Sequence, residues 1–442
     1  MFQSIFKQTN IDFDKSTVYH LPDSIIINTY FIPEDEACPI CGSSSLFKNG
    51  HVKKTIKHCT YYTKLILLKC NFQLYKCKKC GHIFQESNII SPPNLSLSYE
   101  SIYAILEQLK YPNESFINVA REMHISKQDV INVFDTFYKY SSPIALPDII
   151  SFDEKHIGKA ISDRKYIFIM LDWKTKKIYD ILPSRDKNTL YRYFNAIPRE
   201  ERLKVQYITI DMWETYRDVS KTFFRNAKIA IDSFHVMENI NRAMNKVRCS
   251  IMAKYNQRTE NIEDNHIYYY LLKKFDYFFT MEFDDLQDEI RIPKLKTKYH
   301  KTALLKYLFS IDERLEEAYR LTAKYREFNR TANINNCAEE IETIIDLYTS
   351  SKLEQFNDLG NMIINWKDEI LNSFTVIKDC FTIPKKKDEI PVPRRLSNGP
   401  IEGINSIIEQ IKINGKGYTN FDRFKRRVIY SINKELILSN RK

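Results

Sequence analysis

Two Cys-x-x-Cys-Gly sequences near the start of the chain restrict its fold more than any other feature. They begin at Cys38 and Cys77, and 35 residues separate the two cysteine pairs. A glycine after each pair permits a positive φ, so each sequence predicts a tight knuckle that turns the backbone toward the thiolates. Two such knuckles supply the four sulfur ligands that structural Zn²⁺ prefers, with no open position. We therefore predict a zinc ribbon over residues 38–92. Its ligands are Cys38, Cys41, Cys77 and Cys80.

The five remaining cysteines lack a paired spacing, and we expect them to pack inside the fold. They are Cys59, Cys70, Cys249, Cys337 and Cys380. The alternative for the two pairs is that they too are buried thiols, which leaves their matched spacing to chance. Because the chain starts without a signal peptide, we expect a reducing cytosol, where paired cysteines favour a metal over disulfides. No apolar run reaches about 18 residues, so no membrane contact is expected.

The first part of the chain divides by the spacing of its apolar residues. Residues 1–37 hold one alternating run, Ser24–Phe31, that predicts a strand. After the zinc ribbon, a Ser-Pro-Pro sequence starting at Ser91 marks a boundary. Residues 98–142 then show helical spacing in three short stretches. We expect a small helical domain there.

The rest of the chain has the pattern of an α/β protein with an interruption. Between residues 148 and 238, short β-rich runs alternate with helical stretches. Residues 239–390 are charged, almost free of glycine and helical in period, which predicts an all-α insertion. Residues 391–442 are expected to complete the core with a helix that starts near Gly399 and a basic tail.

The three predicted helices include a candidate helix-turn-helix. Ala120 is small enough for two helices to cross closely, and Ile125 can anchor the turn between them. Lys127, Gln128 and Asn132 then point outward, where such side chains reach phosphates or base edges in a DNA major groove. A plain three-helix bundle has the same pattern, so DNA binding and a structural role both stay open.

Positive charge gathers at the end of the chain. The net charge is +11, and residues 394–442 hold eleven Lys or Arg against four acids. Such an excess favours a polyanionic partner. We expect five of these side chains to bind DNA phosphates, with a solvated basic surface as the alternative. They are Arg394, Arg395, Lys425, Arg426 and Arg427.

Three acids occupy positions suited to a shared metal site. Asp153 and Asp211 each follow an apolar run, so both should be held at the edge of a sheet. Pro400 predicts a helix start, which places Glu402 in the first helical turn. Carboxylates in this arrangement suit hard divalent cations, which support phosphoryl transfer. Each acid taken alone is explained equally well as a structural residue.

Four segments in a fixed order surround these acids. They are Phe152–Glu154, Ile210–Arg217, Ile231–Val236 and Asn398–Asn405, and Gly417-Tyr418 and Arg423–Arg427 follow them. With these segments the chain resembles the DDE transposases of the ISL3 group of bacterial insertion sequences, from about residue 38 to 440. The resemblance implies a multidomain α/β protein. In such a protein a ribonuclease H-like catalytic core is interrupted by an all-α insertion and preceded by a zinc ribbon and a helix-turn-helix.

Position by position, the resemblance implies Asp153, Asp211 and Glu402 as the catalytic, metal-binding triad, at intervals of 58 and 191 residues. The long second interval accommodates the insertion. The implied cofactors are two Mg²⁺ or Mn²⁺ ions in the active site, besides one structural Zn²⁺. The chain departs from the family pattern at Glu409 and Ile413, where basic residues are common.

The implied activity is that of a DNA transposase. Such an enzyme binds the terminal inverted repeats of an insertion sequence and catalyses metal-dependent cleavage and strand transfer on double-stranded DNA. Because two element ends must be brought together, we expect a homodimer or a higher oligomer. The expected location is the bacterial cytoplasm, in association with the nucleoid. The alternatives are a domesticated DNA-binding regulator and a ribonuclease H-like nuclease on branched nucleic acid.

Three further polar residues are weighed separately. Asp232 and His235 form an Asp-x-x-His sequence that resembles an active-site motif of Mutator-like transposases. An accessory role in orienting DNA or a metal-bound water and a purely structural role both stay open for them. Glu154 should face the opposite side of its strand from Asp153, and it is not expected to be a ligand.

Overall fold

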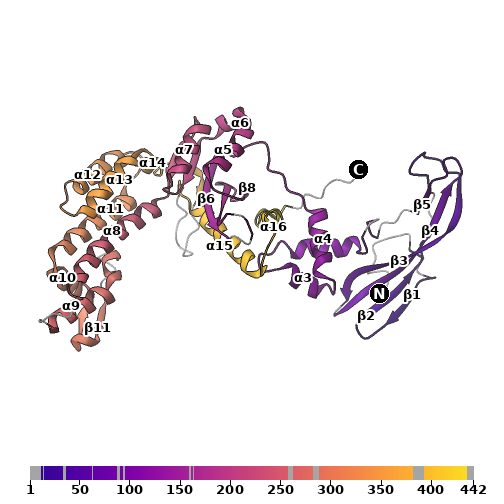
Figure 1. Ribbon diagram of the computed structural model, residues 1–442, viewed down its shortest axis with the longest axis horizontal. Coiled ribbons are helices and arrows are strands. Elements are labelled where there is room, and N and C mark those ends of the chain that lie inside the picture. The colour runs from indigo at the N-terminus through magenta and orange to yellow at the C-terminus, as the bar shows by residue number, and fades with distance from the viewer. Residues whose placement is uncertain are drawn as a thin grey trace. The chain divides into compact units, whose positions relative to one another are not determined.

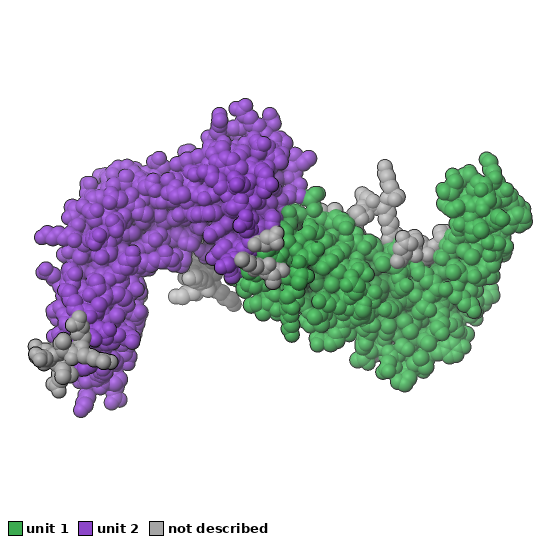
Figure 2. Space-filling view, in the orientation of Figure 1, with its two compact units in different colours: residues 1–141, 157–163, 406–442 green, residues 142–156, 164–405 purple. Residues whose placement is uncertain are grey.

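The computed structural model describes residues 11–12, 14–32, 36–61, 63–86, 90–92, 95–158, 161–162, 164–256, 262–281, 288–381 and 393–435. Contacts divide the chain into two compact units, shown in Figure 2. Unit 1 comprises Met1–Ser141, Ile157–Asp163 and Ser406–Lys442, and unit 2 comprises Ser142–His156 and Arg164–Asn405. The segment 391–442, predicted to complete the core, is thus divided between the two units. Within the described residues, no helix is both long and apolar enough to cross a membrane.

Unit 1 begins with a five-stranded sheet (Figure 1). Its strands are β1 (Thr17–His20), β2 (Ser24–Thr29), β3 (Leu46–Tyr61), β4 (Lys64–Cys77) and β5 (Ile83–Gln85). The order is β1-β2-β4-β3, and β5 pairs with β4. β3 and β4 form a long antiparallel hairpin, while β2 lies parallel to β4. Alternate residues of the inner strands β2 and β4 are buried, as Ile27 and Leu68 illustrate, and Ile56 of the edge strand β3 packs in the same core. The strand predicted from Ser24 is confirmed.

Unit 1 continues with the three predicted helices. They are α2 (Tyr99–Gln108), α3 (Phe116–Glu122) and α4 (Lys127–Phe137). Each starts after a serine whose hydroxyl accepts a hydrogen bond from a first-turn backbone N–H, namely Ser98, Ser115 and Ser126. Between α3 and α4, His124 adopts φ +52° and the Ile125 N–H donates to the Ala120 carbonyl, which ends α3. The last described helix, α16 (Phe421–Asn433), packs on this group, because its Tyr430 hydroxyl donates to the Leu106 carbonyl.

Unit 2 is built on a mixed five-stranded sheet. Its strands are β6 (Ile149–His156), β7 (Tyr166–Asp172), β8 (Ile178–Leu182), β9 (Tyr207–Ile210) and β10 (Lys228–Ile231). The order is β10-β9-β6-β7-β8, with β7 antiparallel to both neighbours and with β6, β9 and β10 parallel to one another. The carboxyl ends of the three parallel strands therefore share one edge. The predicted α/β pattern is confirmed.

Short helices pack on this sheet. They are α5 (Lys187–Ala196), α6 (Arg199–Lys204) and α7 (Glu214–Phe223). Phe152 of β6 contacts the rings of Phe194 on α5 and Tyr216 on α7, with centroids 5.4 and 6.1 Å apart. Aromatic packing thus fixes β6 directly before Asp153.

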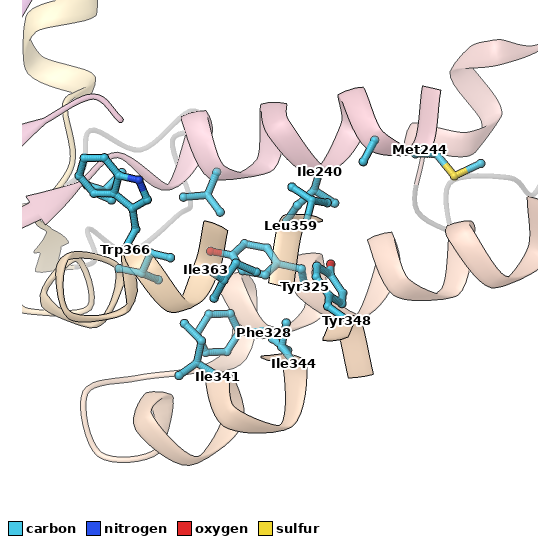
Figure 3. Close-up of a cluster of buried hydrophobic side chains, with 14 of the residues drawn as sticks. Ile240, Met244, Tyr325, Phe328, Ile341, Ile344, Tyr348, Leu359, Ile363 and Trp366 are labelled. Atoms are coloured by element: carbon cyan, nitrogen blue, oxygen red, sulfur yellow. The ribbon is translucent and has the colours of Figure 1, made fainter. Parts of the chain in front are cut away.

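The predicted insertion follows the sheet. Its helices are α8 (Ser233–Lys254), α9 (Ile262–Lys274), α10 (Lys301–Ile311), α11 (Glu313–Thr331), α12 (Cys337–Thr349), α13 (Glu354–Asn365) and α14 (Lys367–Asn372). Figure 3 shows its core, in which Ile240 of α8, Tyr325 of α11, Ile344 of α12 and Ile363 of α13 are buried together. The prediction that residues 239–390 are all-α is wrong at two places, a β-hairpin and the strand Val376–Phe381 described below. β11 (Glu289–Ile292) and β12 (Thr297–His300) form an antiparallel hairpin, whose apolar alternation at Ile290 and Ile292 is too short to stand out in the sequence.

The chain then returns to the sheet through β13 (Val376–Phe381) and β14 (Pro393–Arg395), which pair antiparallel and lead to α15 (Gly399–Asn414). The Trp173 indole N–H donates to the Ser397 carbonyl at 2.8 Å. Leu396 is buried in a cluster with Ile149 of β6 and Ala230 of β10. These contacts fix the start of α15 against the sheet.

Candidate active site and metal centre

The structure brings the four paired cysteines of unit 1 together. All four Sγ atoms lie within 4.8 Å of one another. The Cys38 and Cys80 sulfurs are 3.5 Å apart, and those of Cys41 and Cys77 are 3.6 Å apart. Sulfurs bound tetrahedrally at about 2.3 Å from Zn²⁺ would be separated by about 3.8 Å. The spacing of the thiols therefore fits a single zinc ion.

Each cysteine pair lies on a knuckle of the predicted form. Gly42 and Gly81 have φ of +67° and +74°, and their N–H groups donate to the carbonyls of Cys38 and Cys77. Hydrogen bonding from the backbone N–H of Cys80, aided by that of Lys79, lowers the pKa of the Cys77 thiol to about 6. This turn therefore favours the thiolate form of Cys77, whereas desolvation and hydrogen bonding with the other three thiols raise the pKa of Cys80 to about 12.

Asp153 and Asp211 lie at the shared edge of the unit 2 sheet. Asp153 is in β6 and Asp211 directly follows β9, and these two strands are parallel neighbours. Their carboxylates form a cluster with that of Glu154, in which one oxygen of each lies within 4.8 Å of the others. The prediction that these two acids lie on adjacent strands is confirmed, but β6 continues past Asp153 to His156, so only Asp211 directly follows the end of its strand.

This acidic cluster is unfavourable for negative charge. Burial, together with the charges of Glu154 and Asp211, raises the pKa of Asp153 to about 7. Burial and the charge of Glu154 raise the pKa of Asp211 to about 7 as well. Such a site gains stability from a bound cation, which offsets both the desolvation and the repulsion.

Glu154 differs from its two neighbours in its partners. It forms an ion pair with Arg185 and accepts a hydrogen bond from the Tyr216 hydroxyl at 3.1 Å. The Arg185 guanidinium in turn stacks on the rings of Tyr166 and Trp213, with 4.3 and 4.4 Å to the centroids. Arg185 thus neutralises the charge of Glu154, although one Glu154 oxygen lies within the acidic cluster. The prediction that Glu154 faces away from Asp153 is therefore wrong in this respect, because strand alternation does not show that the longer Glu154 side chain brings an oxygen within 4.8 Å of the two aspartates.

Glu402 lies in the first turn of α15, as predicted, and its side chain is exposed. It is not part of the cluster formed by Asp153, Glu154 and Asp211. One helical turn later, the Asn405 amide donates to Asp153 Oδ2 at 2.7 Å, so this face of α15 meets the acidic cluster. Partial desolvation and the charge of Asp232 raise the pKa of Glu402, while His235 opposes the shift.

Asp232 and His235 are thus near enough for their charges to act on Glu402. Asp232 is buried at the end of β10, where its Oδ1 accepts the Phe234 N–H and begins α8. Its Oδ2 accepts the Asn398 N–H at 2.9 Å. His235 pairs with Glu238 on the same helix, at 3.7 Å. The contacts of Asp232 are those of a residue that joins two helix starts.

The three predicted DNA-contacting residues of α4 are exposed, as expected. Lys127, Gln128 and Asn132 share the solvent side of this helix, and the Gln128 amide donates to Asn132 Oδ1 at 2.7 Å. A short hydrogen bond between these two side chains fixes both amides on the surface.

The C-terminal arginines are largely internal, and for Arg427 the expected phosphate contact is wrong. Arg427 is 0% exposed, and its guanidinium donates to the carbonyls of Tyr111 and Glu114 at 2.9 and 2.8 Å. Arg426 is 9% exposed, pairs with Asp135 and Asp422, and donates to the Tyr138 carbonyl. These side chains attach α16 to the helices of unit 1, a role that the charge count alone did not indicate.

The other predicted basic contacts are only partly accessible. Arg395 donates to the Asn329 carbonyl at 2.9 Å and stacks on the Phe374 ring, at 3.8 Å to its centroid. Arg394 lies over the Trp173 ring at 5.3 Å, and burial lowers its pKa. Lys425 is half-buried in α16. Their contact with DNA stays a prediction.

Two comparisons place the chain among known proteins. A model of the ISL3-type DDE family, described as transposase, matches residues 150–428, a range that includes Asp153, Asp211 and Glu402. The chain is also similar to the insertion element ISM1 uncharacterized 48.3 kDa protein of Methanobrevibacter smithii, at 23% identity over 259 residues. That match covers 54% of this chain and 60% of the relative.

Proposed function

The chain belongs to the ISL3-type transposase family, and on that premise we propose that it binds the terminal inverted repeats of an insertion sequence and cuts and joins DNA. One observation carries the proposal. Asp153 and Asp211 meet at the shared edge of β6 and β9, and Asn405 joins the helix of Glu402 to Asp153. The sheet order, with three antiparallel strands followed by two parallel to the first, supports a ribonuclease H-like core for residues 148–238.

We propose Asp153, Asp211 and Glu402 as ligands of the two divalent cations that the family implies. Carboxylate oxygens suit Mg²⁺ or Mn²⁺, and the raised pKa values of Asp153 and Asp211 mark a site that a cation would stabilise. When bound, such ions activate water or a DNA 3′-hydroxyl and stabilise charge on the scissile phosphate. The chain's own contribution is rigidity, because buried strands hold both aspartates and an amide fixes one of them.

The four-cysteine cluster is proposed to hold one structural Zn²⁺. Its four thiols complete a tetrahedral set, so this ion would organise the knuckles without taking part in the chemistry. The ion would also fix the ends of the β3–β4 hairpin, because Cys77 is the last residue of β4 and Cys41 lies shortly before β3.

The proposed partner is double-stranded DNA, bound by a homodimer or a larger assembly. The exposed side chains of α4 support a helix-turn-helix that reads base edges with Lys127, Gln128 and Asn132. Arg394 and Lys425 are retained as candidate phosphate contacts. His235, whose charge acts on Glu402, is retained as an accessory residue, whereas Asp232 is assigned a positioning role below.

A cleavage assay tests the proposal directly. The inverted repeats are found by sequencing DNA that flanks the gene, and a duplex ending in one repeat is incubated with the purified chain and Mg²⁺ or Mn²⁺. We expect metal-dependent cleavage at the repeat end, no cleavage of a scrambled duplex and no cleavage by Asp153→Asn. Cleavage of branched substrates regardless of the repeats would favour a nuclease. Repeat-specific binding without cleavage would favour a domesticated regulator.

A further inference from the structure

The first inference concerns a basic segment of unit 1 that no proposal above uses. Residues 38–85 contain nine lysines and no arginine, aspartate or glutamate. The C-terminal tail has a comparable excess of positive charge, but the guanidinium groups of Arg426 and Arg427 are buried and donate to backbone carbonyls. The zinc-ribbon segment is therefore the strongest candidate for a positive surface directed at solvent.

Strand pairing gathers part of this charge on one face of the sheet. Lys53 on β3 lies opposite Asn71 on β4, Thr55 lies opposite Lys69, and Asn28 on β2 lies beside Lys69. We call these five residues the lysine face. Their neighbours Ile56 and Leu68 are 0% exposed on the opposite, core-facing side, whereas Lys53, Thr55 and Lys69 are exposed.

The lysine face is hollowed and has no acid. A hollow of about 640 Å³ lies over it and is lined by Asn28, Tyr30, Lys53, Lys54, Thr55, Lys69, Cys70 and Asn71. Ammonium groups, amides and a hydroxyl are all donors that reach phosphate oxygens. The lining offers no stripe of stacking rings for unpaired bases, since Tyr30 is its only aromatic residue.

We propose that the lysine face binds the sugar-phosphate backbone of double-stranded DNA. The proposal rests on the proposed function and adds a second contact to it. The face would position the duplex without reading its sequence, while α4 reads the bases. Lysines suit this role because each acts as a compact point charge toward phosphate.

Salt dependence of binding tests the lysine face. We propose Lys53→Gln/Lys69→Gln in the full-length chain, with affinity for repeat and scrambled duplexes measured by fluorescence anisotropy across a salt series. Each lost phosphate contact should reduce the slope of log K against log salt by roughly 0.9, so the double variant should lose about 1.8 on both duplexes. The matched control is Lys15→Gln/Lys64→Gln, which removes the same charge at residues that bind Asp12 and the Leu21 carbonyl.

The outcomes separate this proposal from the transposase function. An unchanged slope in a variant that keeps its circular dichroism spectrum would overturn the lysine face, as would an equal loss in the control. A loss confined to RNA or single-stranded DNA would also overturn it. If the slope falls as expected but the wild-type chain never cleaves repeat ends, the lysine face stands and the transposase function fails.

The second inference rests on a different observation, a buried hydrogen-bond network in unit 2. Asn398, 2% exposed, directly precedes α15. Its amide donates to the Phe152 carbonyl at 3.0 Å, and its Oδ1 accepts the Thr209 hydroxyl at 2.8 Å. Its backbone N–H donates to Asp232. Thr209 is bonded in turn to Ser151 at 2.7 Å.

Each proposed ligand lies within four residues of a member of this network. Phe152 precedes Asp153, Thr209 lies two residues before Asp211, and Asn398 lies four residues before Glu402. We infer that Asn398 is a positioning residue that sets where α15 begins and hence where Glu402 lies relative to the two aspartates. Asp232 shares this task, because its carboxylate bonds the starts of both α8 and α15.

A conservative pair of variants tests the network. Thr209→Val keeps the shape of the side chain but removes the hydroxyl that donates a hydrogen bond to Asn398. Thr209→Ser keeps that hydroxyl. Hydrogen bonds made directly to metal ligands are typically worth roughly 10- to 100-fold in affinity, and this bond lies one residue further out. Mn²⁺ binding followed by electron paramagnetic resonance should therefore weaken by up to about tenfold, in the valine variant only. This readout does not need cleavage activity. A valine variant that melts earlier but binds Mn²⁺ as the wild type does would overturn the inference, and so would equal weakening in both variants.

Discussion

The four-cysteine cluster and the acidic cluster each bring like side chains together, but the two clusters draw their residues from different parts of the chain in different ways. The cysteines come from two knuckles at the ends of one hairpin, and each knuckle is built by its own glycine. The proposed triad comes from β6, the end of β9 and α15, which only the folded sheet brings near one another. The first cluster is therefore set by local turns, and the second depends on long-range pairing.

The largest effect should come from removing the third acid of the active site. If Glu402 is that acid, Glu402→Gln should reduce repeat-end cleavage by at least about 10²- to 10³-fold, the loss that follows removal of one preorganised electrostatic group. Glu154→Gln should reduce cleavage far less, because Arg185 already neutralises this carboxylate. Single-turnover cleavage with a fixed Mg²⁺ concentration compares the two.

Glu409→Gln is the matched control for this prediction. Glu409 is on the same helix and pairs with Lys412 at 2.8 Å, so its loss changes the charge of α15 away from the triad. If Glu154→Gln abolished cleavage while Glu402→Gln retained it, the acidic cluster of Asp153, Glu154 and Asp211 would itself be the catalytic site.

The same contrast explains which features could be predicted from the sequence. The cysteine pairs and their glycines are a local pattern, and two apolar runs predicted the strands before Asp153 and Asp211. The link between Glu402 and these acids came from the family resemblance, because no periodicity spans 191 residues. The partners of Glu154 lie on other elements, Arg185 just before α5 and Tyr216 in α7, so they depend on tertiary packing.

The basic side chains show the limit of charge counting. Arg427 and Lys53 contribute equally to net charge, but one bonds two buried carbonyls and the other is exposed on a sheet. A lysine at an outward position of a strand stays exposed when the sheet folds. An arginine on a helix is buried when that side of the helix packs against other helices. Only the packing of α16 on the helices of unit 1 distinguishes them.

The next effect is on the local cluster. Cys77→Ser should remove one zinc ligand and lower the zinc content from one ion per chain toward none, since structural sites depend on all four ligands. Because zinc binding and folding of such ribbons are coupled, the unfolding transition of unit 1 should broaden or disappear. Elemental analysis and thermal denaturation measure the two effects. Cys249→Ser, in α8 outside the cluster, should keep the zinc, and loss of zinc there as well would mean that the cluster is not the site.

The smallest effect should be a difference in pH dependence between the two clusters. In metal-free protein, Asp153 and Asp211 have folded-state pKa values of about 7, above the unfolded value of about 3.9. A raised folded pKa means that their contribution to stability is complete below about pH 4 and is lost as the pH rises through 7. The melting temperature in chelator should therefore fall over this range, and Asp211→Asn should flatten the fall.

Added Mg²⁺ should stabilise the protein more at pH 8 than at pH 6, because the ion binds the ionised carboxylates. The cysteine cluster should respond in the opposite sense, since acid protonates thiolates and releases zinc. A melting temperature that rose with pH in chelator would show that the two aspartates are not forced together in the metal-free protein.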